Sequence, residues 1–189
     1  MQNKIRAIIE SSVEVKQQAL ERNAGVIEAI ITASILCLKN GGTLFFFGNG
    51  GSAADSQHVA AEFIGRFQRE RRALAAMALT TDTSILTCLA NDYSYDIVFS
   101  RQLEALGKKG DMAFGISTSG KSSNVIKAFQ AAKDRGMLTV AFTGGDGGPL
   151  AASADMSVVV PSRVTARIQE SHITIFHAIC EIVEGAFIL

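Results

Sequence analysis

Apolar residues in the N-terminal part of the chain recur with the spacing of an α-helix. They form two sets, first Ile5, Ile8, Ile9, Val13 and Leu20, and then Val26, Ile27, Ile30, Ile31, Ile35 and Leu38. Residues three or four positions apart share one face of a helix, and the run Asn40-Gly41-Gly42 ends the second set. The pattern therefore predicts two helices before the first strand.

Beyond residue 41 the pattern changes to short apolar runs that alternate with helical segments. The runs predict five strands: Thr43–Phe47, Ala75–Leu79, Met112–Ile116, Met137–Phe142 and Met156–Val160. The helical segments are Ser52–Gly65, Ser84–Leu106 with a break near Asn91, Ser122–Arg135, a short piece after Pro149, and Ala166 to about Phe187. Because the apolar runs are almost unbroken, both faces of each strand should be covered, which indicates a parallel sheet between layers of helices.

Length and composition favour one domain. The chain has 189 residues, of which 48% are hydrophobic and only two are proline, so it can bury a sizeable core. We expect a single α/β domain over residues 1–189. Residues 1–40 would form the N-terminal helices, and residues 41–189 the α/β core with its C-terminal helix.

The charge balance argues against binding to nucleic acid or to an anionic membrane surface. Eighteen basic residues match eighteen acidic ones, so the chain carries no net field that would attract a polyanion. One basic cluster, made of Arg66, Arg69, Arg71 and Arg72, lies between two apolar segments. We expect this cluster to be a solvated loop.

Cysteine usage and the absence of targeting signals suggest a cytoplasmic protein. Cys37, Cys88 and Cys180 are far apart, each lies in apolar sequence, and no C-x-x-C pair occurs. Reduced, buried thiols are therefore expected. The first residues lack the apolar region of a secretory signal, and no run approaches the roughly 18 apolar residues that a membrane span needs.

Three loops that follow predicted strands are rich in glycine and hydroxyl groups. They are Gly48–Ser52, Ser117–Gly120 and Thr143–Gly148. In a parallel sheet, ligands bind at the carboxyl ends of the strands, where such loops lead into helices. The second loop continues to Ser122 and brings four hydroxyl groups to the start of a helix, more than helix capping requires, so a phosphate site is predicted there.

The same segment also matches a nucleotide-binding pattern. Residues Gly115–Ser122 satisfy G-x-x-x-x-G-K-S in the correct context of a strand followed by a helix. However, none of the predicted strands ends in an apolar run followed by an aspartate that could hold magnesium. A P-loop nucleotide-binding protein therefore remains the less favoured alternative.

Two helical segments carry residues that could bind a metal or transfer protons. His58 and Glu62 are four residues apart, so they share one helix face, and Gln169 and His177 lie on the apolar side of the last helix. Taken alone, the first pair could equally be a surface ion pair. Gln169 and His177 are separated by about 12 Å of helix rise. For both to reach one ion, the first turn of that helix must be irregular or one residue must come from a neighbouring subunit.

Asn91 and Asp92 interrupt a helical pattern just before Tyr93. Such a pair can be an ordinary helix end or turn. It could equally hold sugar hydroxyls near a phosphate pocket, and the local sequence does not separate the two alternatives.

Taken together, these motifs resemble those of the sugar isomerase (SIS) domain family. The resemblance rests on Gly48-Asn49-Gly50-Gly51-Ser52, the His58/Glu62 pair, Leu79-Thr80-Thr81-Asp82, Asn91-Asp92-Tyr93, Ile116-Ser117-Thr118-Ser119-Gly120, Thr143-Gly144-Gly145-Asp146-Gly147-Gly148 and Ala166-Arg167-Ile168-Gln169-Glu170. It runs from about Gly41 to the end of the chain, and it is strongest to the phosphoheptose isomerase branch of the family.

The resemblance implies a three-layer αβα sandwich of the flavodoxin-like type, a homotetramer with active sites near subunit boundaries, and one zinc ion per site. The zinc ligands would be His58, Glu62, Gln169 and His177. The substrate contacts would be Asn49, Gly50, Gly51, Ser52, Glu62, Asn91, Asp92, Ser117, Thr118, Ser119, Ser122 and Gln169. In this family the serine-rich loop holds a sugar phosphate, which weakens the nucleotide alternative.

The implied reaction converts sedoheptulose 7-phosphate to D-glycero-D-manno-heptose 7-phosphate through an enediol, the first step of bacterial ADP- or GDP-heptose synthesis for lipopolysaccharide, capsule or a related glycan. Glu62 would be the base and His177 the acid or proton shuttle. The alternative within the family is a non-catalytic SIS protein that binds a replication initiator. Such relatives lack the carboxylate and the last histidine, whereas this chain has both.

Overall fold

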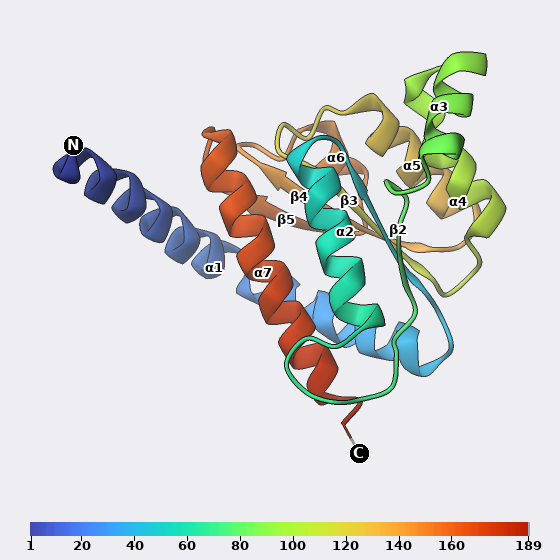
Figure 1. The fold of residues 1–189 in the computed structure, drawn as a ribbon, viewed down its shortest axis with the longest axis horizontal. Helices are drawn as coiled ribbons and strands as arrows, with labels where there is room; N and C mark the ends of the chain where they lie inside the picture. Colours follow the sequence, from blue (N-terminus) through green and yellow to red (C-terminus); the bar gives the residue numbers. More distant parts are fainter. Residues whose placement is uncertain (189) are drawn as a thin grey trace.

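The computed structural model describes residues 1–188, which form a parallel sheet between helices (Figure 1). Five strands in this range pair in the order β2-β1-β3-β4-β5, all parallel. Their bounds are β1 Leu44–Gly48, β2 Ala76–Ala78, β3 Met112–Ser117, β4 Leu138–Gly144 and β5 Met156–Val160. The strand predictions are confirmed, with ends that shift by at most two residues.

The helices between the strands also follow the predicted segments closely. Their bounds are α1 Gln2–Lys39, α2 Gly51–Ile64, α3 Thr83–Asp92, α4 Ser100–Leu106, α5 Ser123–Asp134, α6 Gly148–Ser153 and α7 Thr165–Gly185, with a 3₁₀ turn η1 at Tyr95–Ile97. The predicted break near Asn91 is confirmed, because α3 ends at Asp92 and α4 begins only at Ser100. Within residues 1–188 no helix is long and apolar enough to cross a membrane.

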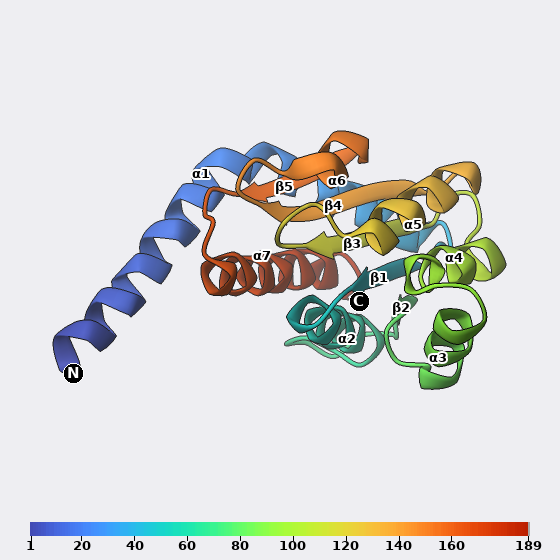
Figure 2. The same cartoon turned by 90° about the horizontal axis from the view of Figure 1, so that it is seen from above.

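Each face of the sheet has its own hydrophobic core. The core under α2, α7 and the second half of α1 contains the contacting rings of Phe46, Phe114, Phe142 and Phe176. The other core lies under α4, α5 and α6 and includes Phe47, whose ring contacts those of Phe99 and Phe129. Figure 2 shows the helices on either side of the sheet. The predicted three-layer α/β fold is confirmed.

The prediction of two N-terminal helices is wrong, because α1 is one unbroken helix of 38 residues. Asn23 and Gly25 look like a break in the sequence, but Asn23 is buried and its side chain bonds the backbone. Its amide group donates to the carbonyls of Ala19 and Val159 and accepts from the Val159 N–H. The amide thus ties the middle of α1 to the edge strand β5, which outweighs the weak helix propensity of this stretch.

The prediction of three buried thiols is also wrong at one position. Cys37 and Cys180 are buried, but Cys88 is exposed. It lies on α3, a helix in which only Leu89 is buried, and its Sγ is 3.5 Å from Oδ2 of Asp92. Cys88 lies in apolar sequence but not in the core, because α3 lies at the edge of the molecule and buries only Leu89.

Candidate active site

The strand order places two loops side by side at the carboxyl end of the sheet. The chain leaves β1 toward β2 and returns on the other side of β1 to β3, so the loops after β1 and β3 flank the point where the strand order reverses. Ligands of open α/β sheets bind at this point. A pair of amide hydrogen bonds joins the loops, because Asn49 and Asn124 each donate to the other over 2.9 Å.

The loop after β3 presents its hydroxyl groups at the start of α5. The Oγ of Ser117 lies 2.9 Å from that of Ser122 and 3.5 Å from that of Ser119, which also accepts from the N–H of Lys121 over 3.2 Å. Gly120 has a positive φ of 65°, and a Cβ atom at this position would overlap the backbone of Gly147, so this loop packs closely on the glycine loop after β4. The free N–H groups and hydroxyls at a helix start favour an anion.

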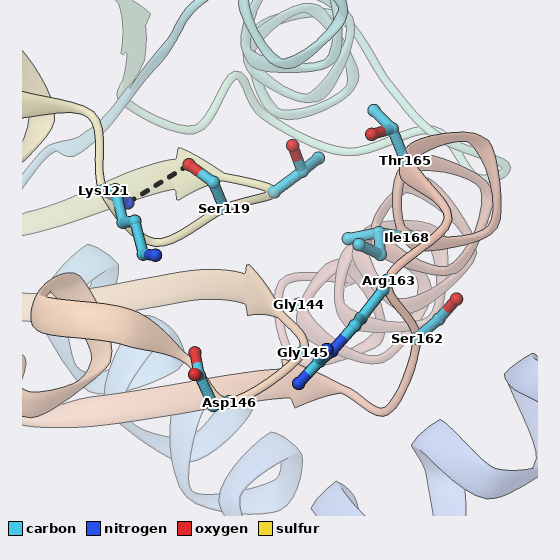
Figure 3. A pocket seen from close by; sticks show the side chains of 10 residues that line it. Ser119, Lys121, Gly144, Gly145, Asp146, Ser162, Arg163, Thr165 and Ile168 are labelled. Carbon is cyan, nitrogen blue, oxygen red and sulfur yellow. Dashed lines mark hydrogen bonds between the residues drawn. The ribbon is translucent and has the colours of Figure 1, made fainter.

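A cavity of about 350 Å³ opens between these two loops and the segment that enters α7 (Figure 3). Thr118, Ser119 and Lys121 line one side, while Asp146 and Arg163 line the other. Sequence reasoning missed Arg163, although it follows β5 at the carboxyl end of the sheet, where a basic residue is itself a signal. The cations Lys121 and Arg163 outnumber the anion Asp146, so the lining of the cavity carries net positive charge. This charge lies next to Ser117–Ser122, the serine loop.

Helices α2 and α7 run side by side in the same direction, and Figure 1 shows them as neighbours on one face of the sheet. Gln169 contacts Gly51 at the start of α2, so closely that a Cβ atom on residue 51 would overlap the Gln169 amide. Two turns farther along both helices, His177 meets His58. The predicted site residues of the two helices therefore face one another along one seam.

Glu62, His58 and His177 form a contiguous set of side chains. The Nε2 of His58 lies 3.1 Å from Oε1 of Glu62 and 3.4 Å from Nε2 of His177. The His58 side chain is 47% exposed and that of Glu62 is 23% exposed, so both remain accessible to a ligand. On the other side of His177 lies the ring of Phe67, with the two ring centres 5.4 Å apart.

Asp55 adds a carboxyl group next to this set, and sequence reasoning did not single it out. It lies on α2 one turn before His58, and its Oδ2 is buried with no hydrogen-bond partner among the described residues. Burial raises the pKa of the Asp55 carboxyl group, while the nearby His58 acts in the opposite direction.

The predicted solvated loop of arginines is wrong for one of its members. Residues 65–75 do form a loop, and Arg66, Arg69 and Arg72 are exposed. The Arg71 side chain, however, is only 1% exposed and lies 3.4 Å from the buried carboxylate of Glu184. A basic run in the sequence gave no sign that one of its members has a buried partner more than a hundred positions away.

Comparison with known proteins identifies the family of this chain. A family model described as "SIS domain" matches residues 8–144. The chain belongs to the SIS domain family. It is 57% identical over 176 residues to a phosphoheptose isomerase from Roseiflexus sp. (strain RS-1), which covers 93% of this chain and 89% of that relative.

Solved structures of relatives agree with the fold over almost the whole length. A phosphoheptose isomerase from Neisseria gonorrhoeae is 46% identical, with a TM-score of 0.92 over 97% of this chain and 98% of that one. One from Francisella tularensis is 36% identical, with a TM-score of 0.93 over 97% of each chain. This SIS domain therefore matches the fold of these isomerases over almost all of its length.

Within this SIS domain, Gln169 contacts Gly51 at the start of α2, and it precedes His177 by about two turns of α7. Helix α7 is continuous from Thr165, so no irregular first turn brings Gln169 toward His177. Of the two explanations considered from the sequence, the irregular helix is excluded, and a contribution from a neighbouring subunit remains a prediction. In one chain, Gln169 belongs to the seam near the serine loop.

Asn91 and Asp92 are exposed at the end of α3, where the amide of Asn91 donates to the carboxylate of Asp92 over 2.8 Å. Asp92 is the last residue of the helix, so the pair does form the helix end that the sequence allowed. Within residues 1–188 no hydrogen bond connects it to the serine loop of this SIS domain. Its predicted contact with substrate stays a prediction.

Proposed function

We propose that this chain is an aldose–ketose isomerase that converts sedoheptulose 7-phosphate to D-glycero-D-manno-heptose 7-phosphate. The observation that carries the proposal is the contiguous set of Glu62, His58 and His177 on the seam that begins at the serine loop. Relatives of high identity that are named phosphoheptose isomerase support it. They do not favour a non-catalytic SIS protein or a P-loop nucleotide-binding protein.

The reaction moves one proton between adjacent carbons and another between their oxygens. In the proposed mechanism Glu62 takes the proton from carbon 1 of the ketose and returns it to carbon 2 of the enediol. His177 transfers the hydroxyl proton of oxygen 1 to the carbonyl oxygen 2, so that the aldose forms with no net change in protons. His58 orients the Glu62 carboxylate through the 3.1 Å contact.

The phosphate would bind at the other end of the seam. Ser52, Ser117, Ser119 and Ser122 supply hydroxyl groups there, and Lys121 and Arg163 line the adjoining cavity. His58 follows Gly51 by seven positions of α2, which is about 10 Å of helix rise. A substrate that carries its phosphate far from the reacting carbons fits this separation, and the anchored phosphate positions those carbons.

We further propose that His58, Glu62, Gln169 and His177 hold one zinc ion per subunit. Imidazole and carboxylate donors suit zinc, and two ligands of a tetrahedral ion lie about 3.4 Å apart when each bond is about 2.1 Å. The separations of 3.1 and 3.4 Å between neighbouring donor atoms agree with that value. Bound zinc would polarise the substrate carbonyl as a Lewis acid.

Within residues 1–188 no three His, Cys, Asp or Glu side chains already surround one point as a metal site does. The proposed site therefore depends on the Gln169 amide, or on a group from another subunit, as a further ligand. If the further ligand comes from another subunit, zinc binding depends on the assembly of the oligomer.

We propose that the active form is a homotetramer. Figure 1 shows the N-terminal part of α1 projecting from the body, and residues 1–11 are all exposed. Its apolar residues Ile5, Ile8, Ile9, Val13 and Leu20 are each between 48% and 60% exposed. An apolar groove of about 320 Å³ between α1 and α7 continues this stripe from Leu20. A stripe of this kind on a projecting helix favours packing against other copies of the chain.

The substitution Ile9→Glu tests the assembly. It places a charge in the middle of the stripe and should shift the sedimentation coefficient from a tetramer to smaller species while the helix content is retained. The neighbouring Glu10→Ala serves as the control and should leave the assembly unchanged. An Ile9→Glu variant that sediments as the wild type does would contradict the role given to this stripe.

The function is tested by incubating the purified chain with sedoheptulose 7-phosphate, with and without a chelator, and detecting the aldose product. Turnover that is lost with the chelator and restored by Zn²⁺ supports both proposals, and metal analysis of the purified protein gives an independent readout. Turnover that persists after zinc is removed would reject the metal while keeping the isomerase. A sugar phosphate substrate agrees with the cytoplasmic location that the sequence suggests.

A further inference from the structure

Glu184 lies near the end of α7 and is buried, with only 2% of its side chain exposed. Its carboxylate accepts three consecutive backbone N–H groups, from Phe67 over 2.8 Å, Gln68 over 2.8 Å and Arg69 over 2.9 Å. Burial would by itself raise the pKa of this carboxyl group, but the three N–H donors and the guanidinium of Arg71 outweigh it and lower the pKa. The carboxylate is therefore charged and holds the loop after α2 against α7.

Arg71 completes this cluster from the same loop. Its Nη2 donates to the carbonyl of Glu62 over 2.7 Å, and its Nη1 donates to the carbonyls of Gly65 and Arg72 over 2.9 and 3.0 Å. The last carbonyls of a helix have no partner within the helix, and α2 has no basic residue in its own last turn. Arg71 thus serves as the cap of α2, at the turn that carries Glu62.

Both ends of the cluster reach the proposed catalytic pair. Glu184 follows His177 by two turns of α7, on the same side of the helix, and both contact the loop after α2. Phe67 donates its N–H to Glu184 and places its ring against His177. Arg71 binds the backbone of Glu62 itself. A displacement of the cluster would therefore move the base and the acid relative to each other.

We propose that Glu184, Arg71 and Phe67 are positioning residues that set the relative placement of Glu62 and His177. The proposal rests on the proposed isomerase function only for its kinetic consequence. The serine loop lies at the opposite end of the α2–α7 seam, so the cluster should affect turnover and leave phosphate binding unchanged.

The kinetic test compares Glu184→Gln, Arg71→Met and Phe67→Leu with a matched control. Each should lower kcat by about ten-fold or more and change KM less than about three-fold, because small misplacement of acid and base is costly. Arg71→Lys keeps the charge but loses the planar set of donors, so its kcat should lie between those of Arg71→Met and the wild type.

Asp111→Asn is the control because Asp111 is a buried carboxylate of the same kind just before β3, and among the described residues none of its hydrogen bonds goes to α2, α7 or the loop between α2 and β2. It accepts the N–H groups of Thr43 and Lys108 over 2.8 and 3.0 Å and pairs with the Lys108 ammonium. This variant should lose thermal stability and keep its kcat. Values of kcat within two-fold of the wild type in Glu184→Gln, Arg71→Met and Phe67→Leu would overturn the proposal. A parallel rise in KM and loss of stability, as in a general folding defect, would overturn it as well.

A measurement without substrate separates this proposal from the proposed function. The chain has three histidines, so the side-chain ¹⁵N signals of a ¹⁵N-histidine sample can be assigned with His58→Gln and His172→Gln variants. The His177 signals should shift in Phe67→Leu and in Glu184→Gln and stay in place in Asp111→Asn. Phe67 is only partly buried, so Phe67→Leu should fold even if the other variants do not. Unchanged His177 signals would contradict the positioning role whether or not the chain turns over the heptose phosphate.

Discussion

At the amino end of the sheet, carboxylates bind the backbone of the loops that enter the strands. Asp111 binds the N–H groups of Thr43 and Lys108, and Asp155 binds the N–H and hydroxyl of Thr139. At the carboxyl end, side chains bind mainly one another. There, the hydroxyl pair of the serine loop and the pair of Asn49 and Asn124 are contacts between side chains. The His58–Glu62 pair, farther along the α2–α7 seam, is another.

This difference separates structural polar groups from functional ones. A carboxylate that binds backbone N–H groups cannot change partners unless the loop itself unfolds. Two partly exposed side chains that bind each other can exchange that partner for a ligand at little cost in free energy. The cluster around Glu184 is the exception, because it has the backbone-bound form of the amino end but lies beside the proposed catalytic pair.

The largest effect is expected when the α2–α7 seam loses its proton carriers. Glu62→Gln and His177→Gln should each lower kcat by about a hundred-fold or more, the usual scale for a general acid or base. Thermal stability should change little, because both side chains are partly exposed. Asp155→Asn, at the amino end, should lower stability and keep kcat. Near-normal turnover in Glu62→Gln or His177→Gln would remove that residue from the mechanism.

His172 lies near the carboxyl end of the sheet, but it is buried and bonded to the backbone. If the distinction between structural and functional polar groups holds, His172 should contribute to stability. Its Nε2 donates to the carbonyl of Thr143 over 3.0 Å, and burial lowers its pKa to about 4. In the unfolded chain a histidine binds a proton below about pH 6.5, whereas the folded chain does so only near pH 4. The free energy of unfolding should therefore fall by about 3 kcal/mol between pH 7 and pH 4 on account of this residue.

Urea denaturation of wild type and His172→Gln over this pH range measures the effect. The variant should start from a lower stability and depend less steeply on pH, since other groups contribute equally to both proteins. If the free energy of unfolding falls by the same amount in both proteins as the pH is lowered, His172 is not the group that titrates.

A smaller effect is expected at the serine loop. Ser119→Ala removes an exposed hydroxyl that bonds only its own loop, so stability should change by less than about 0.5 kcal/mol. A hydrogen bond to a charged phosphate contributes about 1.5 to 3 kcal/mol, so kcat/KM should fall by about ten-fold or more, mainly through KM. Ser153→Ala, on α6, is the control. A loss in kcat alone would place Ser119 with the proton carriers instead of the anchor.

Much of the fold could be predicted from the sequence because strands and helices of a three-layer protein have distinct apolar patterns. Continuous runs such as Phe45–Phe47 belong to strands buried on both faces, and glycine with hydroxyl residues marks the loops at the carboxyl end. The apolar pattern did not predict the continuous helix around Asn23, because the side chain of this polar residue bonds the backbone of β5. It also failed at Cys88, where an apolar segment covers the edge of the molecule.

The candidate site, too, could be predicted only in part from local sequence. Helical spacing put His58 and Glu62 on one face, because that relation is local and repeats every turn. Their meeting with His177 was expected only from the resemblance, since no local rule relates residues more than a hundred positions apart. Arg71 shows this limit most clearly, since four arginines in one charged segment look alike until one of them finds a buried carboxylate.

By itself the sequence determined the class of fold, the order of strands and helices, and the loops at which a phosphate could bind, because each depends on neighbours within one or two turns. Tertiary structure alone decided that α1 is continuous, that Gln169 lies against Gly51, and that Glu184 and Arg71 join the ends of α2 and α7. These are contacts between elements distant in the chain, and they form only because burial around the sheet brings the two helices together.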